Sequence, residues 1–489
     1  MSDSNRAQLT GVREVTLGTT PNTPRMRKVR HLSAPLIYKP EFETSNEKRE
    51  DRMGTDPVKV GESNNGPINF EFSYPEQDAL IDTFICSSMQ ADWVNTPSRF
   101  NDGVADSVIT GVVASTGVVS VTTGAAFVLG HLCKLTGFTA AGNNTLKKIT
   151  TGSPTVPAFG AGAGLADEAV PPAAARMKVV GFEGASGDIT ALADGLGSTA
   201  LDFTTLGLTV GGFVKIGGTG AAFQFATAAC NDWARVIAVA ATKVTLDNLP
   251  TGWTTDAGAA KTIRVFFGDL IKNGVTKIGA TLERAFLDQT VPTYIAQRGM
   301  VVNEANWSIE TKKIINGSFA FIGMGGAQST VGLDAVPDAA SAIADFPVMA
   351  AGANVGRIAE SGVKITGNNF VKNLSLKITN NIRDLTDVEN LGPVDLGSGR
   401  CDVSVNLSTY FGSNTFLTKL FAGTAVNINA RVLKANRAVV WSVPRLTYTD
   451  GAPDDSGINA DIMLSLTAQA SFDTLTNAHI LMNRLEYYE

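Results

Sequence analysis

Apolar and polar side chains alternate along the stretch that begins at Gly66. Successive side chains of a β-strand point to opposite faces, so this period of two predicts a half-buried strand. A long polar loop precedes the strand, and Pro75 to Phe84 predicts a short helix after it. One face holds Ile68, Phe70, Phe72 and Tyr74, and the other holds Asn69, Glu71 and Ser73. The chain is therefore expected to build a sheet with one buried and one solvent-exposed face.

The same order of features recurs near the C-terminal end. A strand is predicted at 374–378, a polar loop at 380–398, an alternating strand after Gly399 and a short helix at 414–421. Gly66 and Gly399 are offset by 399 − 66 = 333 residues, and Ile68 and Cys401 share that offset. Identity between the stretches is low, so pattern and order carry the prediction of two copies of one β-domain. The first copy takes residues 1–103 with 261–345, and the second takes residues 346–489.

Residues 104–260 differ from their surroundings, because they are rich in Gly, Ala and Thr and poor in charge. Within them, residues 129–137 resemble residues 210–218, with Lys134 and Lys215 spaced by 215 − 134 = 81. This echo predicts two small related β-modules inserted into the first copy as an outward-facing decoration. Residues 1–30 lack periodicity, so they are interpreted as an arm or an extended segment. Their basic cluster is interpreted as solvated in preference to a nucleic-acid contact.

Composition and charge limit the classes of function. The chain has 489 residues, 44% of them hydrophobic, which is enough for two to four folded domains. Its net charge of −6 disfavours stable binding to nucleic acid, although a channel that DNA slides through would favour this sign. No apolar run is long enough for a membrane span, and the N-terminus lacks the apolar core of a signal peptide. The four cysteines are far apart, which favours free thiols and a cytosolic origin.

Catalytic signatures are missing from the sequence. There is no nucleophile elbow and no phosphate-binding loop. His131 and Cys133 would share a strand face, but no second pair joins them, as a zinc site would require. Asp454 and Asp455 are interpreted as turn residues beside Pro453, although carboxylates can also meet in space as an acid–base pair. We therefore expect no enzyme activity, no cofactor and no metal.

Motifs in both copies resemble the major tail tube proteins of long-tailed, siphovirus-type bacteriophages. They are Gly18–Pro24, Ser45–Arg49, Asp51–Arg52, Val60–Gly61, Gly66–Phe72, Leu374–Asn381, Gly399–Leu407, Tyr410–Phe411 and Val443–Arg445. The resemblance covers residues 1–100 and 270–489 and leaves out the inserted region. It implies a mainly β fold with two tail-tube-type β-sandwich or barrel domains, each with a short flanking helix. In the family, such domains form rings whose inner strands close into a β-barrel, and the rings stack into a tube.

The resemblance also implies partners and a location. The chain would assemble with itself, enclose the tape-measure protein, meet tail terminator and tail-tip proteins at the tube ends, and let DNA pass without specific binding. It would be made in the host cytoplasm and reside in the virion tail. The long loop of the first copy would reach the neighbouring ring. We predict inter-ring contacts by Glu47, Lys48, Arg49, Glu50, Asp51 and Arg52.

Alternatives stay open at this point. A glycan-binding adhesin of a virion or cell surface would also use Gly/Thr-rich β-modules. A β-rich carbohydrate-active enzyme needs carboxylates near aromatic side chains, and the five Trp and seven Tyr residues are scattered. Two copies per chain predict three chains in a ring with six domains, whereas six chains are expected if the second copy is not a true duplicate.

Overall fold

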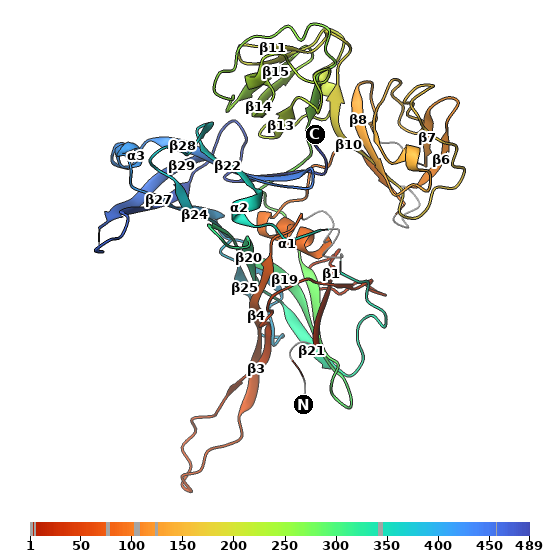
Figure 1. Ribbon diagram of the computed structural model, residues 1–489. Helices are drawn as coiled ribbons and strands as arrows, with labels where there is room; N and C mark the ends of the chain where they lie inside the picture. The colour runs from red at the N-terminus through yellow and green to blue at the C-terminus, as the bar shows by residue number, and fades with distance from the viewer. Residues whose placement is uncertain are drawn as a thin grey trace.

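The protein is built from antiparallel β-strands with few helices, which confirms the predicted mainly β fold class (Figure 1). The computed structural model describes residues 3, 6–74, 79–101, 108–122, 126–340, 346–455 and 457–489. No helix in these ranges is both long and apolar enough to cross a bilayer.

The elements outside the inserted region form the body of the molecule. They are β1 (Ala7–Arg13), β2 (Arg27–Lys28), β3 (Ile37–Glu43), β4 (Val58–Glu71), α1 (Ala79–Met89), β17 (Asp269–Lys272), β18 (Ala280–Phe286), β19 (Thr293–Glu310), β20 (Asn316–Ile322), β21 (Gly325–Ser329), α2 (Ala351–Asn354), β22 (Val355–Glu360), β23 (Val363–Lys364), β24 (Val371–Thr379), β25 (Arg383–Leu385), β26 (Asp395–Gly397), β27 (Asp402–Tyr410), α3 (Thr415–Ala422), β28 (Ala425–Lys434), β29 (Arg437–Asp454), β30 (Met463–Ala470) and β31 (Leu481–Leu485).

The two halves of this body follow one order of elements. The first half contains β1–β4, α1 and β17–β21, and the second contains α2, α3 and β22–β31. In each half a strand pair, β3–β4 or β24–β27, precedes a helix, α1 or α3. A hairpin follows, β18–β19 or β28–β29, and then a strand, β20 or β30, that returns beside the first pair. The long polar loop lies between the first two strands of both halves.

One sheet runs through both halves, and we call it the shared sheet. Its strands lie side by side in the order β3–β4–β20–β19–β24–β27–β30–β29, four from each half. At its centre, β19 of the first half pairs with β24 of the second, and Trp307 lies opposite Leu376. Both halves are therefore joined by an antiparallel ladder.

The long strands β19 and β29 occupy equivalent places and bend between two layers. The C-terminal part of each pairs with its returning strand, and each ladder is interrupted by one unpaired residue, Asn303 or Thr449. Such a bulge bends the strand and increases its twist. The two halves can be aligned at these bulges, and their ladder partners then show which residues are equivalent. In this alignment Ile68 corresponds to Leu407, an offset of 407 − 68 = 339. The offset of 333 taken from the glycines is therefore wrong, because the glycines do not lie at equivalent ladder positions.

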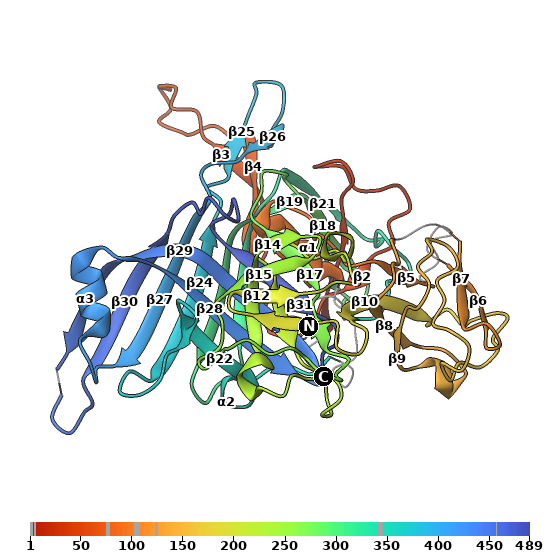
Figure 2. The same cartoon turned by 90° about the horizontal axis from the view of Figure 1, so that it is seen from above.

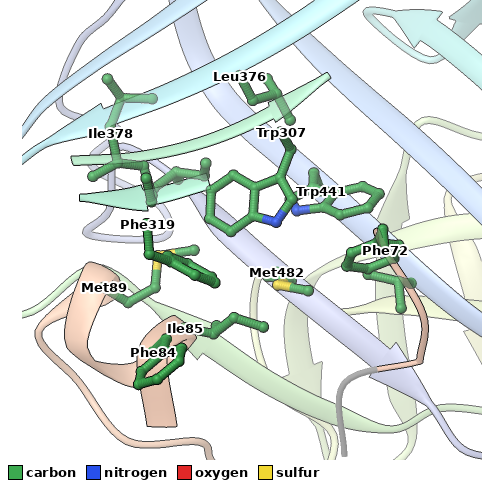
Figure 3. Packing of buried hydrophobic residues seen from close by; sticks show 14 of the residues in the cluster. Phe72, Phe84, Ile85, Met89, Trp307, Phe319, Leu376, Ile378, Trp441 and Met482 are labelled. Carbon is green, nitrogen blue, oxygen red and sulfur yellow. The ribbon is translucent and has the colours of Figure 1, made fainter. Parts of the chain in front are cut away.

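A single hydrophobic core covers the inner face of the shared sheet and spans both halves. Trp307 of β19 lies with its ring centroid 6.4 Å from that of Trp441 of β29 and 5.9 Å from that of Phe319 of β20 (Figure 3). Phe84 of α1 packs edge-on against Phe319 from the helix side (Figure 3). Removing a buried aromatic ring of this size costs about 3–5 kcal/mol. The predicted buried set of Ile68, Phe70, Phe72 and Tyr74 is confirmed as part of this core.

Several element boundaries differ from the prediction. The described part of residues 1–30 is extended but is not a free arm, because β1 pairs along its whole length with β18 and buries Leu9. The strand that was predicted to begin at Gly66 starts earlier, at Val58, so Gly66 lies within β4. The helix α1 extends to Met89, and residues 75–78 of the predicted helix lie outside the described residues. Tertiary pairing, which local pattern does not encode, sets these ends.

The inserted region forms a second sheet (Figure 1). Its strands run from residue 98 to residue 266, slightly beyond the predicted limits of 104 and 260. They are β5 (Ser98–Phe100), β6 (Ile109–Val113), β7 (Val118–Val121), β8 (His131–Thr136), β9 (Leu146–Lys148), β10 (Arg176–Glu183), β11 (Thr190–Leu192), β12 (Gly195–Gly197), β13 (Phe213–Ile216), β14 (Trp233–Ala240), β15 (Lys243–Asp247) and β16 (Arg264–Phe266). β6 and β7 form a separate two-stranded ribbon.

Two segments of the inserted region share a hydrogen-bonding pattern. The Asn144 side chain closes a loop by accepting from the N–H of Phe138 and donating to its C=O. Asn231 makes the same two bonds with Phe225. Each loop contains a short 3₁₀ helix, Ala141–Asn143 or Ala228–Cys230. The chain thus uses one loop-closing device twice, at a spacing of 231 − 144 = 87 residues.

The inserted sheet is fixed to the body by a buried ionic cluster. The Asp269 carboxylate of β17, fully buried, accepts from Lys178 Nζ of β10 at 2.8 Å and from Arg484 Nε of β31 at 2.8 Å. Arg484 Nη1 also reaches Asp82 of α1 at 2.6 Å. Burial alone would raise the pKa of Asp269, but the charges of Lys178 and Arg484 hold it below its ordinary value. The cluster therefore ties α1, β10, β17 and β31 together.

The Asp269→Asn variant should lose about 3 kcal/mol of unfolding free energy, because two buried cations would lose their shared counter-charge. Denaturant unfolding monitored by tryptophan fluorescence measures this loss. Because the pKa of Asp269 is lowered on folding, its contribution is complete above the unfolded value of about 3.9 and is lost as pH falls below it. Asp51→Asn at the exposed hairpin tip is the control and should leave the unfolding free energy nearly unchanged. Equal stability of the two variants would contradict the role of the cluster.

Candidate assembly surfaces

The hairpin formed by β3 and β4 projects far from the body (Figure 1). Its loop contains the six predicted contact residues, Glu47, Lys48, Arg49, Glu50, Asp51 and Arg52, and all six are exposed. Arg49 Nη2 pairs with Asp51 Oδ2 at 2.6 Å, and the N–H of Met53 donates to Asp51 Oδ1 at 3.1 Å. The hydrogen bonds that the structure gives these six residues stay within the loop. The tip therefore presents mixed charge to whatever lies beyond the chain.

The long loop of the second half lies beside this hairpin. It contains the short hairpin β25–β26, and the two tips project on the same side of the molecule (Figure 2). The N–H of Glu62 in β4 donates to the C=O of Leu391 at 3.0 Å, and Lys277 Nζ pairs with Asp395 Oδ1 at 2.7 Å. Burial, together with the charge of Glu41, raises the pKa of Asp384. One chain thus presents two unlike loops at one end.

The shared sheet has a polar face opposite the core. Its side chains alternate with the buried ones along the six inner strands, and most of them are Ser, Thr, Asn or charged residues. The register places more carboxylates than ammonium groups on this face. They are Glu71, Glu304, Glu310, Asp402, Asp450 and Asp454, with Lys39 and Lys377. The face is therefore wide, hydrophilic and net acidic.

Cross-strand polar contacts organise this face. Ser375 Oγ donates to Asn306 Oδ1 at 2.9 Å across the junction between the halves. Lys377 Nζ pairs with Glu304 Oε2 at 3.0 Å on the same ladder. Both ion-pair partners are close to half exposed, so the pair is screened by salt and contributes little stability. Many weak hydrogen bonds therefore order this face.

The shared sheet ends in two free edges. β3 pairs with β4 on one side, and the C-terminal part of β29 pairs with β30 on one side. Among the described residues, β3 and the part of β29 from Tyr448 to Asp454 have no ladder partner on the other side. In the middle of the sheet, β19 has strands on both sides. An unpaired strand edge is a template for another chain.

Catalytic chemistry finds little support in this architecture. No group of three or more His, Cys, Asp or Glu side chains in the described parts of the chain could hold a metal ion. His131 is buried with its Nε2 on the C=O of Leu206, and burial lowers its pKa to about 4. Cys133 is buried beside it as a free thiol. Asp454 ends β29, so it is a strand residue and not the predicted turn residue. His131 and Cys133 are thus core residues.

Sequence reasoning missed the two edges and the contact between the loops. A signal was present in Pro40 of β3 and Pro453 of β29, because a proline inside a strand is confined to sheet edges and bulges. The contact between Glu62 and Leu391 left no local signal, since it joins residues far apart in the sequence.

The comparisons with known proteins agree with this geometry. A sequence model described as "Phage tail tube protein" matches residues 4–470, which includes the inserted region. No curated protein matches the chain. The match favours a structural role over the adhesin and enzyme alternatives. The chain therefore belongs to the phage tail tube protein family and is a structural protein of the virion tail.

Proposed function

We propose that this chain is a fused pair of tail-tube units that closes into trimeric rings, and that the stacked rings form the DNA conduit of a long-tailed, siphovirus-type phage. The observation that carries the proposal is the ladder between β19 and β24. It joins one unit to the next inside the chain and serves as a template for the junction between chains. The template predicts that β29 of one chain pairs with β3 of its neighbour.

The template also gives the register of that junction. Inside the chain, Glu304 lies opposite Thr379. With the bulges superposed, Glu304 corresponds to Asp450 (450 − 304 = 146), because each follows its bulge. Asn373 pairs with Ser408 in the second half, and Ser33 pairs with Asn69 at the equivalent position of the first half. When Ser33 is aligned with Asn373, Lys39 corresponds to Thr379. Asp450 would therefore face the neighbour's Lys39, and opposite charges directly across a ladder stabilise it.

Prolines at the two edges fit this assembly. By the same correspondence, Pro453 takes the place of Trp307, and Pro40 takes the place of Asn380. The N–H of Asn380 donates across the internal junction, to the C=O of Asn303. A proline there removes a donor from the outward side, which discourages uncontrolled edge pairing of free chains. Ring closure would then rely on the remaining backbone hydrogen bonds between β29 and β3 and on the shape complementarity of the two chains.

The polar face of the shared sheet would line the bore. Once the edges close, the core and helices lie on the other face, which leaves the acidic face inward. Its net negative charge would repel DNA phosphates and let DNA slide. The tape-measure protein would fill this bore before DNA passage, and terminator and tail-tip proteins would cap the end rings. The inserted sheet would decorate the outside.

Cryo-electron microscopy of assembled tubes tests the proposed ring. We expect three chains per ring, with the two halves alternating around an approximately sixfold inner wall. The two loops differ in sequence, since one carries Glu47–Arg52 and the other carries Asp384, Asp387 and Glu389. True sixfold symmetry is therefore expected to fail. Six identical chains per ring would overturn the fused-pair proposal.

A disulfide between Ile37→Cys and Ala452→Cys tests the register. The template places these exposed residues opposite each other, where a non-hydrogen-bonded pair has its Cα atoms about 4.5 Å apart. Oxidised tubes of the double variant should give covalent trimers on non-reducing gels. The out-of-register pair Lys39→Cys with Ala452→Cys is the control and should give few. Equal cross-linking of both pairs would exclude this register.

Replacing residues 47–52 by Gly and Ser residues of equal number tests the contact loop. The loop makes its own hydrogen bonds at the exposed tip, so the chain should fold with unchanged thermal stability. We expect rings in negative stain but few long tubes, because the charged contacts between rings are lost. Normal tube length and growth rate in this variant would show that the loop does not join the rings.

A further inference from the structure

A cavity of about 720 Å³ lies between the inserted region and the second half of the body. One wall comes from the start of β14 and the turn after β15, with Asp232, Trp233 and Thr251. The other wall comes from β22, β23 and β28, and it contributes Arg357 and Lys364 among others. The cavity is separate from the shared sheet and from the hairpin tips, and the proposed closure of the ring does not use it.

Cations outnumber carboxylates around this cavity. Arg431 of β28 lines it with a side chain that is 7% exposed, and its guanidinium carbon lies 5.2 Å from the centre of the Trp233 ring. Arg357 and Lys364 line the same space, and Lys215 lies behind Asp232. Asp232 is the acidic residue among the cavity's described lining residues. The local charge is therefore positive.

The ion pairs with Asp232 are loose. Arg431 Nη1 lies 3.5 Å from Asp232 Oδ1, and Arg357 Nη1 lies 3.8 Å from Oδ2. Charge-assisted hydrogen bonds are normally about 2.7–2.9 Å long. Nε and Nη1 of Arg431 and Nε of Arg357 are buried and have no hydrogen-bond acceptor among the described residues. Burial lowers the pKa of Arg431 to about 10, which reports the cost of holding this charge away from water.

We propose that this cavity is a binding site for an oxyanion, either a carboxylate or a phosphate group. Its oxygens would bond the guanidinium groups of Arg357 and Arg431, and Lys364 at the rim would add a third cation. Planar guanidinium groups suit two-oxygen recognition, and a partly dry site strengthens each bond. The ligand would supply hydrogen-bond acceptors for the two guanidinium groups, because the Asp232 oxygens are too distant for short charge-assisted bonds.

Two sources could supply such a group. It can be a free anion, such as inorganic phosphate, or an acidic side chain from another copy of this chain. The strand β22 borders the cavity, and in Figure 2 it lies on the opposite side of the body from the loops that contain β3 and β25–β26. In a stack of rings, the loop of one ring that carries Asp384, Asp387 and Glu389 could therefore approach the cavities of the next ring.

Calorimetric titration of the soluble full-length chain with inorganic phosphate tests the site. Chloride keeps the ionic strength constant, which separates binding from general salt effects. We expect one saturable site per chain. Lys364→Gln, at an exposed position, should weaken binding by about threefold to tenfold, as for a partly exposed charge contact. The matched control Lys372→Gln, on β24 outside the cavity, should not change it.

Asp232→Asn gives a readout that a purely structural role of this residue would not produce. Removal of the competing carboxylate should tighten phosphate binding several-fold, and phosphate should restore the thermal stability that this variant loses. The absence of saturable binding of phosphate and of acetate by both the wild-type chain and Asp232→Asn would overturn the proposal. Binding that is insensitive to Lys364→Gln and Asp232→Asn alike would also overturn it.

Assembled tubes then distinguish the two sources. If a neighbouring copy supplies the carboxylate, tubes should take up far less than one phosphate per chain. If the ligand is a free anion, uptake should remain near one per chain. The titration of the soluble chain does not depend on tube formation, so failure of the oxyanion site and failure of the ring proposal are separate results.

Discussion

The antiparallel ladder between β19 and β24 is the interaction on which the rest of the body depends. It makes one sheet from two halves that would otherwise each carry one more open edge. The same junction lets a single core form, because Trp307 of the first half packs against Trp441 and Leu376 of the second (Figure 3). Backbone hydrogen bonds set the register, and burial of large side chains supplies most of the stability.

In the proposed ring, this sheet is completed by a neighbouring chain. Its outer strands, β3 and β29, stand where β24 and β19 stand inside the molecule, so the fold contains a working example of its own assembly contact. The prolines Pro40 and Pro453 reduce the risk that such edges pair at random. In the proposed ring, the two unlike loops at one end would give the ring an orientation and two kinds of contact.

The inserted sheet is held to this body by more than its two chain connections. Asp269, Lys178 and Arg484 form a buried ionic cluster, and an apolar cluster that includes Trp233 and Val440 fills the contact. Breaking the ion pairs of a buried carboxylate costs several kcal/mol of free energy, because the charges are left without partners. The cluster therefore favours one fixed orientation of the insert. The cavity beside Arg431 lies where this contact leaves a gap between the same two parts.

The sequence by itself determined the fold class, the buried face of the strand from Ile68 to Tyr74 and the family, because strand alternation and motif order are local properties. It also placed the charged residues 47–52 in one exposed loop. The true offset between the halves, the strand β1 and the free edges of β3 and β29 were decided only by the tertiary structure. The physical reason is that each depends on which distant strand supplies the ladder partner, and the period of a strand is the same for every partner.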